Sequence, residues 1–276
     1  MKPIWTPLMI EMFSLPLMQR ALIGGMLIAI MASFYGPFIV QRRLAFLGSG
    51  LAHAAFGGVA VGMYLGREPL LVAIPFTVFI AVAIVWVRAH TELAADTAIG
   101  VFISIAMALG IIFLYLREQN SSDATTYLFG SILALNKRDL YLSLVALLGS
   151  LLSLPFWGQW AYATFDETMA RVDRHPVMRD EYLLMVSVAI LVVISVKIVG
   201  ILLVSAFLVI PAASARLISR RFIHMMWWTL LINVAGVLGG LMASFFADLP
   251  SGPAIVLVHS FAFLVAFVYH RMRSSS

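Results

Sequence analysis

His53 places an imidazole in the middle of an apolar stretch, LAFLGSGLAHAAFGGVAVG, which runs from residue 44 to residue 62. Ionisable side chains inside a membrane are costly and usually face a cavity or a transport path. Neutral imidazole is a good ligand for transition metals such as zinc, whereas a hydroxyl is a weak one. Ser49 precedes His53 by four residues, so a helix places both on one face. The pair predicts a weak metal site; a histidine that hydrogen-bonds a neighbouring helix is the alternative.

His259 lies at comparable depth in the last apolar stretch, but no motif surrounds it. We expect packing or a local hydrogen bond there, with metal ligation as the weaker interpretation. The chain has no cysteine, which excludes thiolate sites and disulfides. It has no HExxH or GxSxG motif and no second histidine within one helical turn of His53, which argues against an intramembrane enzyme. The apolar stretches hold almost no carboxylates, which argues against a secondary transporter.

The composition is that of a polytopic membrane protein. Of the 276 residues, 62% are apolar and 11% are charged, with a mean hydropathy of +1.01. Soluble domains are roughly 45–50% apolar and about 25% charged. The apolar runs are continuous, which excludes a β-barrel. The net charge of +5 is explained by basic cytoplasmic loops, so no nucleic-acid partner is expected.

The apolar runs predict an all-α bundle in one transmembrane domain over residues 1–276, with an amino-terminal interfacial segment at residues 1–19. The short run Tyr127–Leu135 cannot cross, so we expect it to be interfacial or re-entrant. Lys197 is expected to snorkel towards a helix end, and Asp248 to lie at the outer interface. The nine expected spans are 20–40, 45–65, 69–88, 96–116, 139–158, 182–199, 201–218, 224–246 and 252–270.

Nine spans put most basic loops on one side, which must be cytoplasmic. The amino terminus is then outside and the carboxyl terminus is cytoplasmic. The long charged loop 159–181 falls on the cytoplasmic side. In it, Asp166 can cap a short helix, and Pro176 stops that helix from continuing. The loop is either a plain connector or a docking helix for a cytoplasmic ATPase. The chain lacks a GxxxxGK[ST] phosphate loop, so we expect ATP hydrolysis on a separate subunit.

Several motifs occur in order along the chain: RRLAFLGSGLAHAAFGG, DTAIG, YLFGSIL, DETMARV, KIVGILLVSAFLVIPAASARLIS and DLPSGPAIVL. Together they resemble the permease subunits of the bacterial ABC-3 family, which import zinc, manganese or iron. The resemblance covers about residues 20–270. It implies the vitamin-B12-permease (type II) importer fold, a homodimer in a bacterial or archaeal cytoplasmic membrane, two cytoplasmic ATPase subunits and an extracytoplasmic metal-binding protein.

The resemblance also implies roles for individual residues. His53 takes the family's intramembrane histidine position, but the family's aspartate four residues earlier is Ser49 here. Loss of that hard oxygen ligand favours zinc over manganese. The metal is transported cargo, and no permanently bound cofactor is expected. A permease of the same architecture for a chelated metal or a small organic cofactor is the alternative, and a wide, largely neutral cavity in the homodimer would favour it.

The remaining assigned residues lie in loops. The contacts expected to couple the chain to the ATPase are Asp166, Glu167, Ala170, Arg171 and Arg174. The outer charges Arg117, Glu118 and Asp123 are ordinary solvated groups or contacts for the binding protein.

Overall fold

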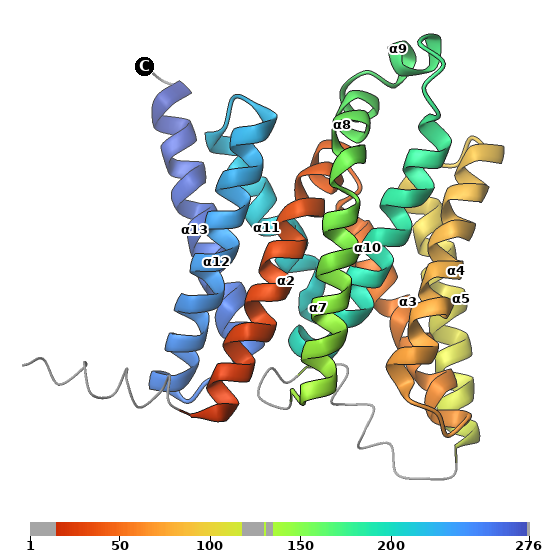
Figure 1. Ribbon diagram of the computed structural model, residues 1–276, viewed down its shortest axis with the longest axis vertical. Helices are drawn as coiled ribbons and strands as arrows, with labels where there is room; N and C mark the ends of the chain where they lie inside the picture. Colours follow the sequence, from red (N-terminus) through yellow and green to blue (C-terminus); the bar gives the residue numbers. More distant parts are fainter. Residues whose placement is uncertain (1–14, 118–129, 131–134, 275–276) are drawn as a thin grey trace, which may run out of the picture.

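The chain is a bundle of helices, shown in Figure 1. The computed structural model describes residues 15–117, 130 and 135–274. A short 3-10 turn, η2 (Leu154–Phe156), joins α7 to α8. The helices are α2 (Pro16–Gln41), α3 (Ala45–Tyr64), α4 (Pro69–His90), α5 (Ala95–Leu116), α7 (Lys137–Leu152), α8 (Trp157–Phe165), α9 (Glu167–Val172), α10 (Val177–Val199), α11 (Ile201–Ile218), α12 (Phe222–Ala247) and α13 (Ser251–Ser274).

Eight helical segments of the described part are long and apolar enough to cross a membrane. They correspond to eight of the nine predicted spans. The fifth, Lys137–Phe165, combines α7, η2 and α8 and extends beyond the predicted end at residue 158. The ninth corresponds to α11, whose apolar part, Leu203–Ile218, is shorter than a full span. Gly200 separates α10 from α11 with φ of +91°, a conformation that glycine adopts readily.

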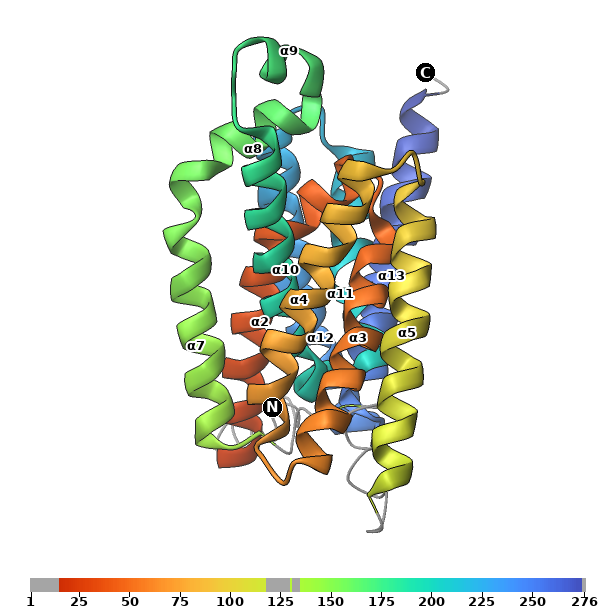
Figure 2. The same cartoon turned by 90° about the vertical axis from the view of Figure 1, so that its right-hand side faces the viewer.

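One end of the bundle carries both α9 and the carboxyl terminus, and we call it the α9 end (Figures 1 and 2). Asp166 caps α9 as predicted, because its Oδ1 accepts a hydrogen bond of 2.9 Å from the backbone N–H of Met169. The α2–α3 turn reaches the same end, since Arg42 contacts Thr164 of α8 there. Asp248 ends α12 in the left-handed conformation, with φ of 51°.

Helix α3 packs against α4, α5, α10 and α11, and its small residues let these helices approach. A Cβ atom at Gly57 would lie 2.5 Å from the Ala106 carbonyl oxygen of α5. A Cβ atom at Gly58 would lie 2.7 Å from the Cα atom of Ala73 on α4. Such close backbone contacts hold membrane helices together where water is absent. The position of α3 therefore depends on glycine at these crossings.

The prediction that Lys197 snorkels is wrong. Its Nζ lies 2.8 Å from Asp139 Oδ1, and the two side chains are 17% and 5% exposed. Asp139 is fixed by a capping box with Asn136 at the start of α7, in which each side chain accepts the other's backbone N–H. Because its ammonium group is paired with Asp139, Lys197 does not extend to water. The ion pair connects the last turn of α10 to the first turn of α7.

Candidate functional site

The His53 ring is oriented by its own helix. Its Nδ1 lies 2.7 Å from the backbone carbonyl oxygen of Ser49, one turn earlier. A carbonyl oxygen only accepts hydrogen bonds, so Nδ1 carries the proton in this contact. Nε2 then keeps its lone pair in the neutral ring, and a lone pair is what a metal ion needs. The backbone thus sets the tautomer that can act as a ligand.

Ser49 and His53 share a face of α3 that the rest of the protomer leaves partly uncovered. Between residues 47 and 60 all other positions of α3 are buried, and these two are half-buried. Ser205 of α11, also half-buried, lies beside this face, because a Cβ atom at Gly48 would be 3.3 Å from its Cα. Sequence reasoning missed Ser205; the signal was a small polar residue inside the stretch KIVGILLVSAFLVI.

The described residues contain no group of three or more His, Asp or Glu side chains that could hold a metal ion. A closed coordination shell at His53 therefore requires donors from elsewhere. Ser49 and Ser205 supply hydroxyl groups at most. An open, weakly ligated site of this kind suits an ion that must leave again.

His259 occupies a different environment from His53. Its side chain is fully buried, and its ring covers Gly236 of α12 so closely that a Cβ atom there would overlap it. Phe207 of α11 packs edge-on against it, with ring centroids 5.0 Å apart. Neither ring nitrogen has a hydrogen-bond partner in the part of the chain that the structure describes. These contacts favour packing over ligation; a role in metal transport stays a prediction.

The segment around α9 is a short, well-anchored helix with an exposed outer face. Ala170 is fully buried and packs with Ala163 and Val177. Glu167 and Arg171 form an exposed ion pair of 2.6 Å, one turn apart. Two apolar side chains beside them, Met169 and Val172, are 51% and 69% exposed. Arg174 follows in the left-handed conformation, with φ of 56°. A rigid helix with a mixed apolar and charged face can dock a partner protein.

Charged residues at the start of α10 brace this segment. Asp180 is fully buried and receives His175 Nε2 at 2.7 Å and Arg179 Nη2 at 3.3 Å. Glu181 pairs with Arg88 at the end of α4, at 2.6 Å. Sequence reasoning assigned none of these residues a contact, although the acidic pair among basic residues was visible in the sequence. The network connects the ends of α4, α9 and α10.

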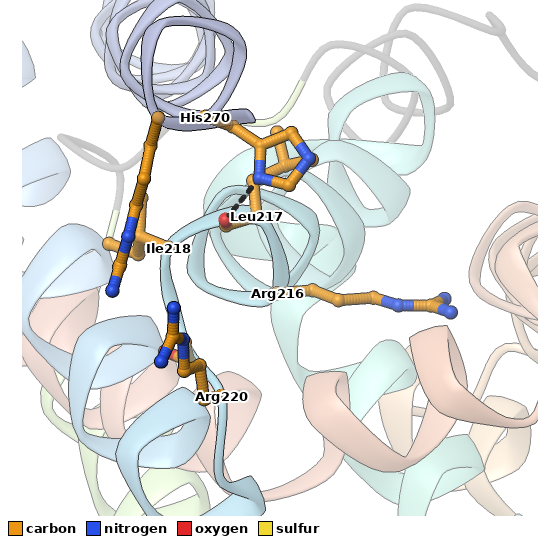
Figure 3. A pocket seen from close by; sticks show the side chains of 7 residues that line it. Arg216, Leu217, Ile218, Arg220 and His270 are labelled. Atoms are coloured by element: carbon orange, nitrogen blue, oxygen red, sulfur yellow. Dashed lines mark hydrogen bonds between the residues drawn. The ribbon is translucent and has the colours of Figure 1, made fainter. Parts of the chain in front are cut away.

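A second feature of the α9 end is a basic pocket of about 250 Å³. Its lining includes Arg216, Arg220, Arg273 and His270, whose Nδ1 donates to the Leu217 carbonyl oxygen at 2.9 Å. Figure 3 shows Arg216 extending away from His270, whereas Arg220 rises from the loop after α11. The pocket concentrates positive charge at the same end as α9.

The predicted outer contacts are only partly described. Arg117 is the residue that follows α5. Glu118 and Asp123 lie outside the described residues, as does most of the segment Tyr127–Leu135. Of that segment, Leu135 is 3% exposed and Gly130 lies against Gly200. Residues 1–14, the bulk of the predicted interfacial segment, are also outside the described part.

Comparison with known proteins gives consistent results. The ABC 3 transport family model matches residues 14–270. The chain is 30% identical over 247 residues to the high-affinity zinc uptake system membrane protein ZnuB of Haemophilus influenzae, covering 89% of this chain and 95% of the relative. It is 32% identical over 260 residues to the manganese transport system membrane protein MntC of Halalkalibacterium halodurans, covering 94% and 89%.

A solved structure of PsaBC from Streptococcus pneumoniae in complex with Fab matches with a TM-score of 0.84 and 30% identity, covering 95% of each chain. The predicted fold class, an all-helical permease of the type II importer fold, is therefore confirmed. The family match extends over nearly the whole chain. This polytopic membrane protein belongs to the ABC 3 transport family, as the membrane-spanning permease of an ABC transporter.

Proposed function

We propose that this chain, as one transmembrane domain, carries divalent transition-metal ions inward across a bacterial cytoplasmic membrane, with zinc first and manganese or iron next. The observation that carries the proposal is His53, an imidazole on a half-covered face of α3 whose Nδ1 is bonded to the backbone, which leaves Nε2 as the nitrogen that can bind a metal. The similarity to zinc and manganese transport proteins supports a metal as the cargo. Imidazole with weak oxygen donors favours zinc among these metals.

The half-covered face of α3 supports a homodimer in which two copies enclose the path. Within one protomer this face has few donors, as described above. A second copy would place another His53 opposite the first and would exclude lipid from the path. We therefore propose that the functional unit contains two copies of this chain.

We propose that α9 is the docking helix for a separate ATPase subunit on each copy. The α9 end is then cytoplasmic, which agrees with its basic residues in the α2–α3 turn and the pocket of Figure 3. The amino terminus lies outside, and an extracytoplasmic metal-binding protein delivers the ion at the opposite end. Arg117, Glu118 and Asp123 are the proposed contacts for that protein.

The test is ATP-dependent uptake by the chain reconstituted in liposomes with candidate ATPase and binding-protein subunits. Labelled zinc, manganese and iron are compared as free ions and as chelates. We expect zinc to accumulate only with ATP, and faster than the other free metals. Uptake without dependence on ATP, or uptake of a chelate alone, would contradict the proposal.

Restoring a carboxylate beside His53 should change the metal preference. In Ser49→Asp, a hard anionic oxygen lies one helical turn from the imidazole. We expect manganese binding to strengthen by roughly tenfold relative to zinc, and release to slow. Competition between labelled zinc and manganese measures the ratio. Ser205→Asp on the neighbouring helix is the matched comparison, and an unchanged ratio in Ser49→Asp would place residue 49 off the path.

Reversing charges on α9 should uncouple the ATPase. Glu167→Arg and Arg171→Glu change the exposed docking face while leaving the spans intact, and the exposed pair contributes only about 0.3–0.5 kcal/mol. We expect ATP hydrolysis to continue while metal uptake falls, in each single variant and in the double reversal. The same exchange at Glu68 and Arg138, an exposed pair in contact at 3.5 Å, is the control. Normal coupling in the double reversal would exclude these two residues from the docking contact.

A further inference from the structure

Arg42 connects the α2–α3 turn to the helix that leads into α9. Its Nε donates to Thr164 Oγ1 at 2.8 Å, and its Nη2 lies 3.4 Å from the Trp160 carbonyl oxygen. Thr164 in turn donates to the same Trp160 carbonyl oxygen at 2.5 Å. Thr164 lies two residues before Asp166, the cap of α9. The guanidinium therefore contacts α8 at the point where the chain turns into the proposed docking helix.

The charge of Arg42 is half-buried, and no carboxylate of the described residues forms an ion pair with it. It lines a pocket of about 270 Å³ together with Glu167, Glu181 and Arg88. Burial lowers the pKa of Arg42 below its ordinary value, and the field of Glu181 and Glu167 opposes this shift. Among the described residues those carboxylates already have partners, namely Arg88 and Arg171. Arg42 is held by neutral oxygens of α8, so its position follows that helix.

The other side of the link is a rigid turn. The backbone N–H of Arg42 donates to the carbonyl oxygen of Phe38, and the backbone N–H of Leu44 donates to that of Ile39, both at 2.9 Å. Arg43 between them has φ of 57°, which fixes the reversal of the chain. Helix α3 begins at Ala45. His53 is eight residues further on, about 12 Å along the helix axis. A displacement of Arg42 therefore moves the start of the helix that carries the imidazole.

We infer that Arg42 is the positioning residue that transmits movement of α8 and α9 to α3, and so to His53. This inference rests on the proposed function. In it, the contact between the Arg42 guanidinium and the Thr164 hydroxyl is the mechanical joint between the ATPase-driven segment and the metal path. Hydrogen-bonded and packed contacts between helices carry coupling between distant sites when both sites bias their arrangement.

The experiment measures metal uptake and ATP hydrolysis together in the reconstituted complex. The variants are Arg42→Gln, Arg42→Lys, Thr164→Val and the double variant Arg42→Gln/Thr164→Val. Arg43→Gln is the matched control, because Arg43 is the exposed neighbour and loses the same charge. Zinc binding to the resting complex and the thermal unfolding midpoint are measured for each.

We expect the number of zinc ions moved per ATP to fall about tenfold in Arg42→Gln and Thr164→Val, the effect of one lost charge-assisted hydrogen bond. The double variant should be no worse than either single one, since both remove one shared contact. Arg42→Lys should recover part of the ratio. Zinc binding and ATPase docking stay at wild-type levels.

The outcomes separate this inference from the function on which it rests. If the wild-type complex shows no ATP-dependent uptake, the proposed function fails. If wild type transports and both single variants keep its ratio, the joint is elsewhere and the inference is wrong. A ratio that falls equally in Arg43→Gln, or falls only with the unfolding midpoint, also overturns it. Should Arg42→Gln fail to fold, the ratio of zinc to ATP in Thr164→Val tests the inference by itself.

Discussion

Uptake of zinc is expected to fall by about 100-fold or more in His53→Ala, because even outer-shell partners of a metal cost roughly 10- to 100-fold when removed. The ring is half-buried on a partly uncovered face, so its loss leaves no packed neighbour unsatisfied. Assembly and ATPase docking should therefore be unchanged. Labelled-zinc uptake, chemical cross-linking of the assembled complex and the unfolding midpoint measure the three quantities.

His90→Ala is the matched control for His53→Ala. His90 Nδ1 makes the same contact with a carbonyl oxygen one turn earlier, Trp86, at 2.8 Å, but at the exposed end of α4. Removing it eliminates an identical local hydrogen bond without touching α3. Equal uptake in the His53→Ala variant and the wild type would show that His53 only packs and does not bind the metal.

Lys197→Ala should destabilise the folded chain by about 3 kcal/mol, because it leaves Asp139 as an unpaired charge that is only 5% exposed. The loss should appear as a lower unfolding midpoint in detergent and as weaker contact between α7 and α10. Arg138→Ala is the control. Arg138 is the residue before Asp139, and its ion pair with Glu68 joins side chains that are 72% and 36% exposed. Breaking this pair should cost less than about 1 kcal/mol.

The double variant Lys197→Met/Asp139→Asn tests the cause of that loss. It removes both charges together, so the unpaired carboxylate no longer exists, and most of the lost stability should return. The amide oxygen introduced by Asp139→Asn can still accept the backbone N–H of Asn136, which keeps the capping contact at the helix start. If the double variant is as unstable as Lys197→Ala, the defect arises from lost packing of the lysine stem and not from charge.

The helices were predictable because the membrane imposes a simple length rule. Each apolar run of about 20 residues had to form a helix to satisfy its backbone. The same reasoning found the cap at Asp166, since a carboxylate before a short helix accepts a free N–H group. It failed at Phe165, where α8 continues beyond the predicted span after the 3-10 turn at Leu154–Phe156. Local hydropathy does not record whether a helix continues out of the membrane.

The contacts between distant residues were not predictable in the same way. Lys197 and Asp139 are 58 positions apart, and nothing in either neighbourhood specifies the other. Arg42 and Thr164 are separated by 122 positions. Such pairs depend on how helices pack, which one sequence does not encode in any local pattern. The histidine was identifiable because an ionisable group in an apolar span is unusual in itself; its metal role stays a prediction.

The half-covered face of α3 determines how few polar groups one copy of the chain needs to bind a metal ion. A homodimer closed by a two-fold axis repeats every residue of its shared face once on each side. If Ser49 and His53 face that axis, one ion meets two imidazoles, which are good zinc ligands, and two hydroxyls, which are weak ones. Each gene product then encodes only half of a coordination sphere. A single substitution removes two ligands at once, and a tandem fusion with one altered copy would separate their contributions.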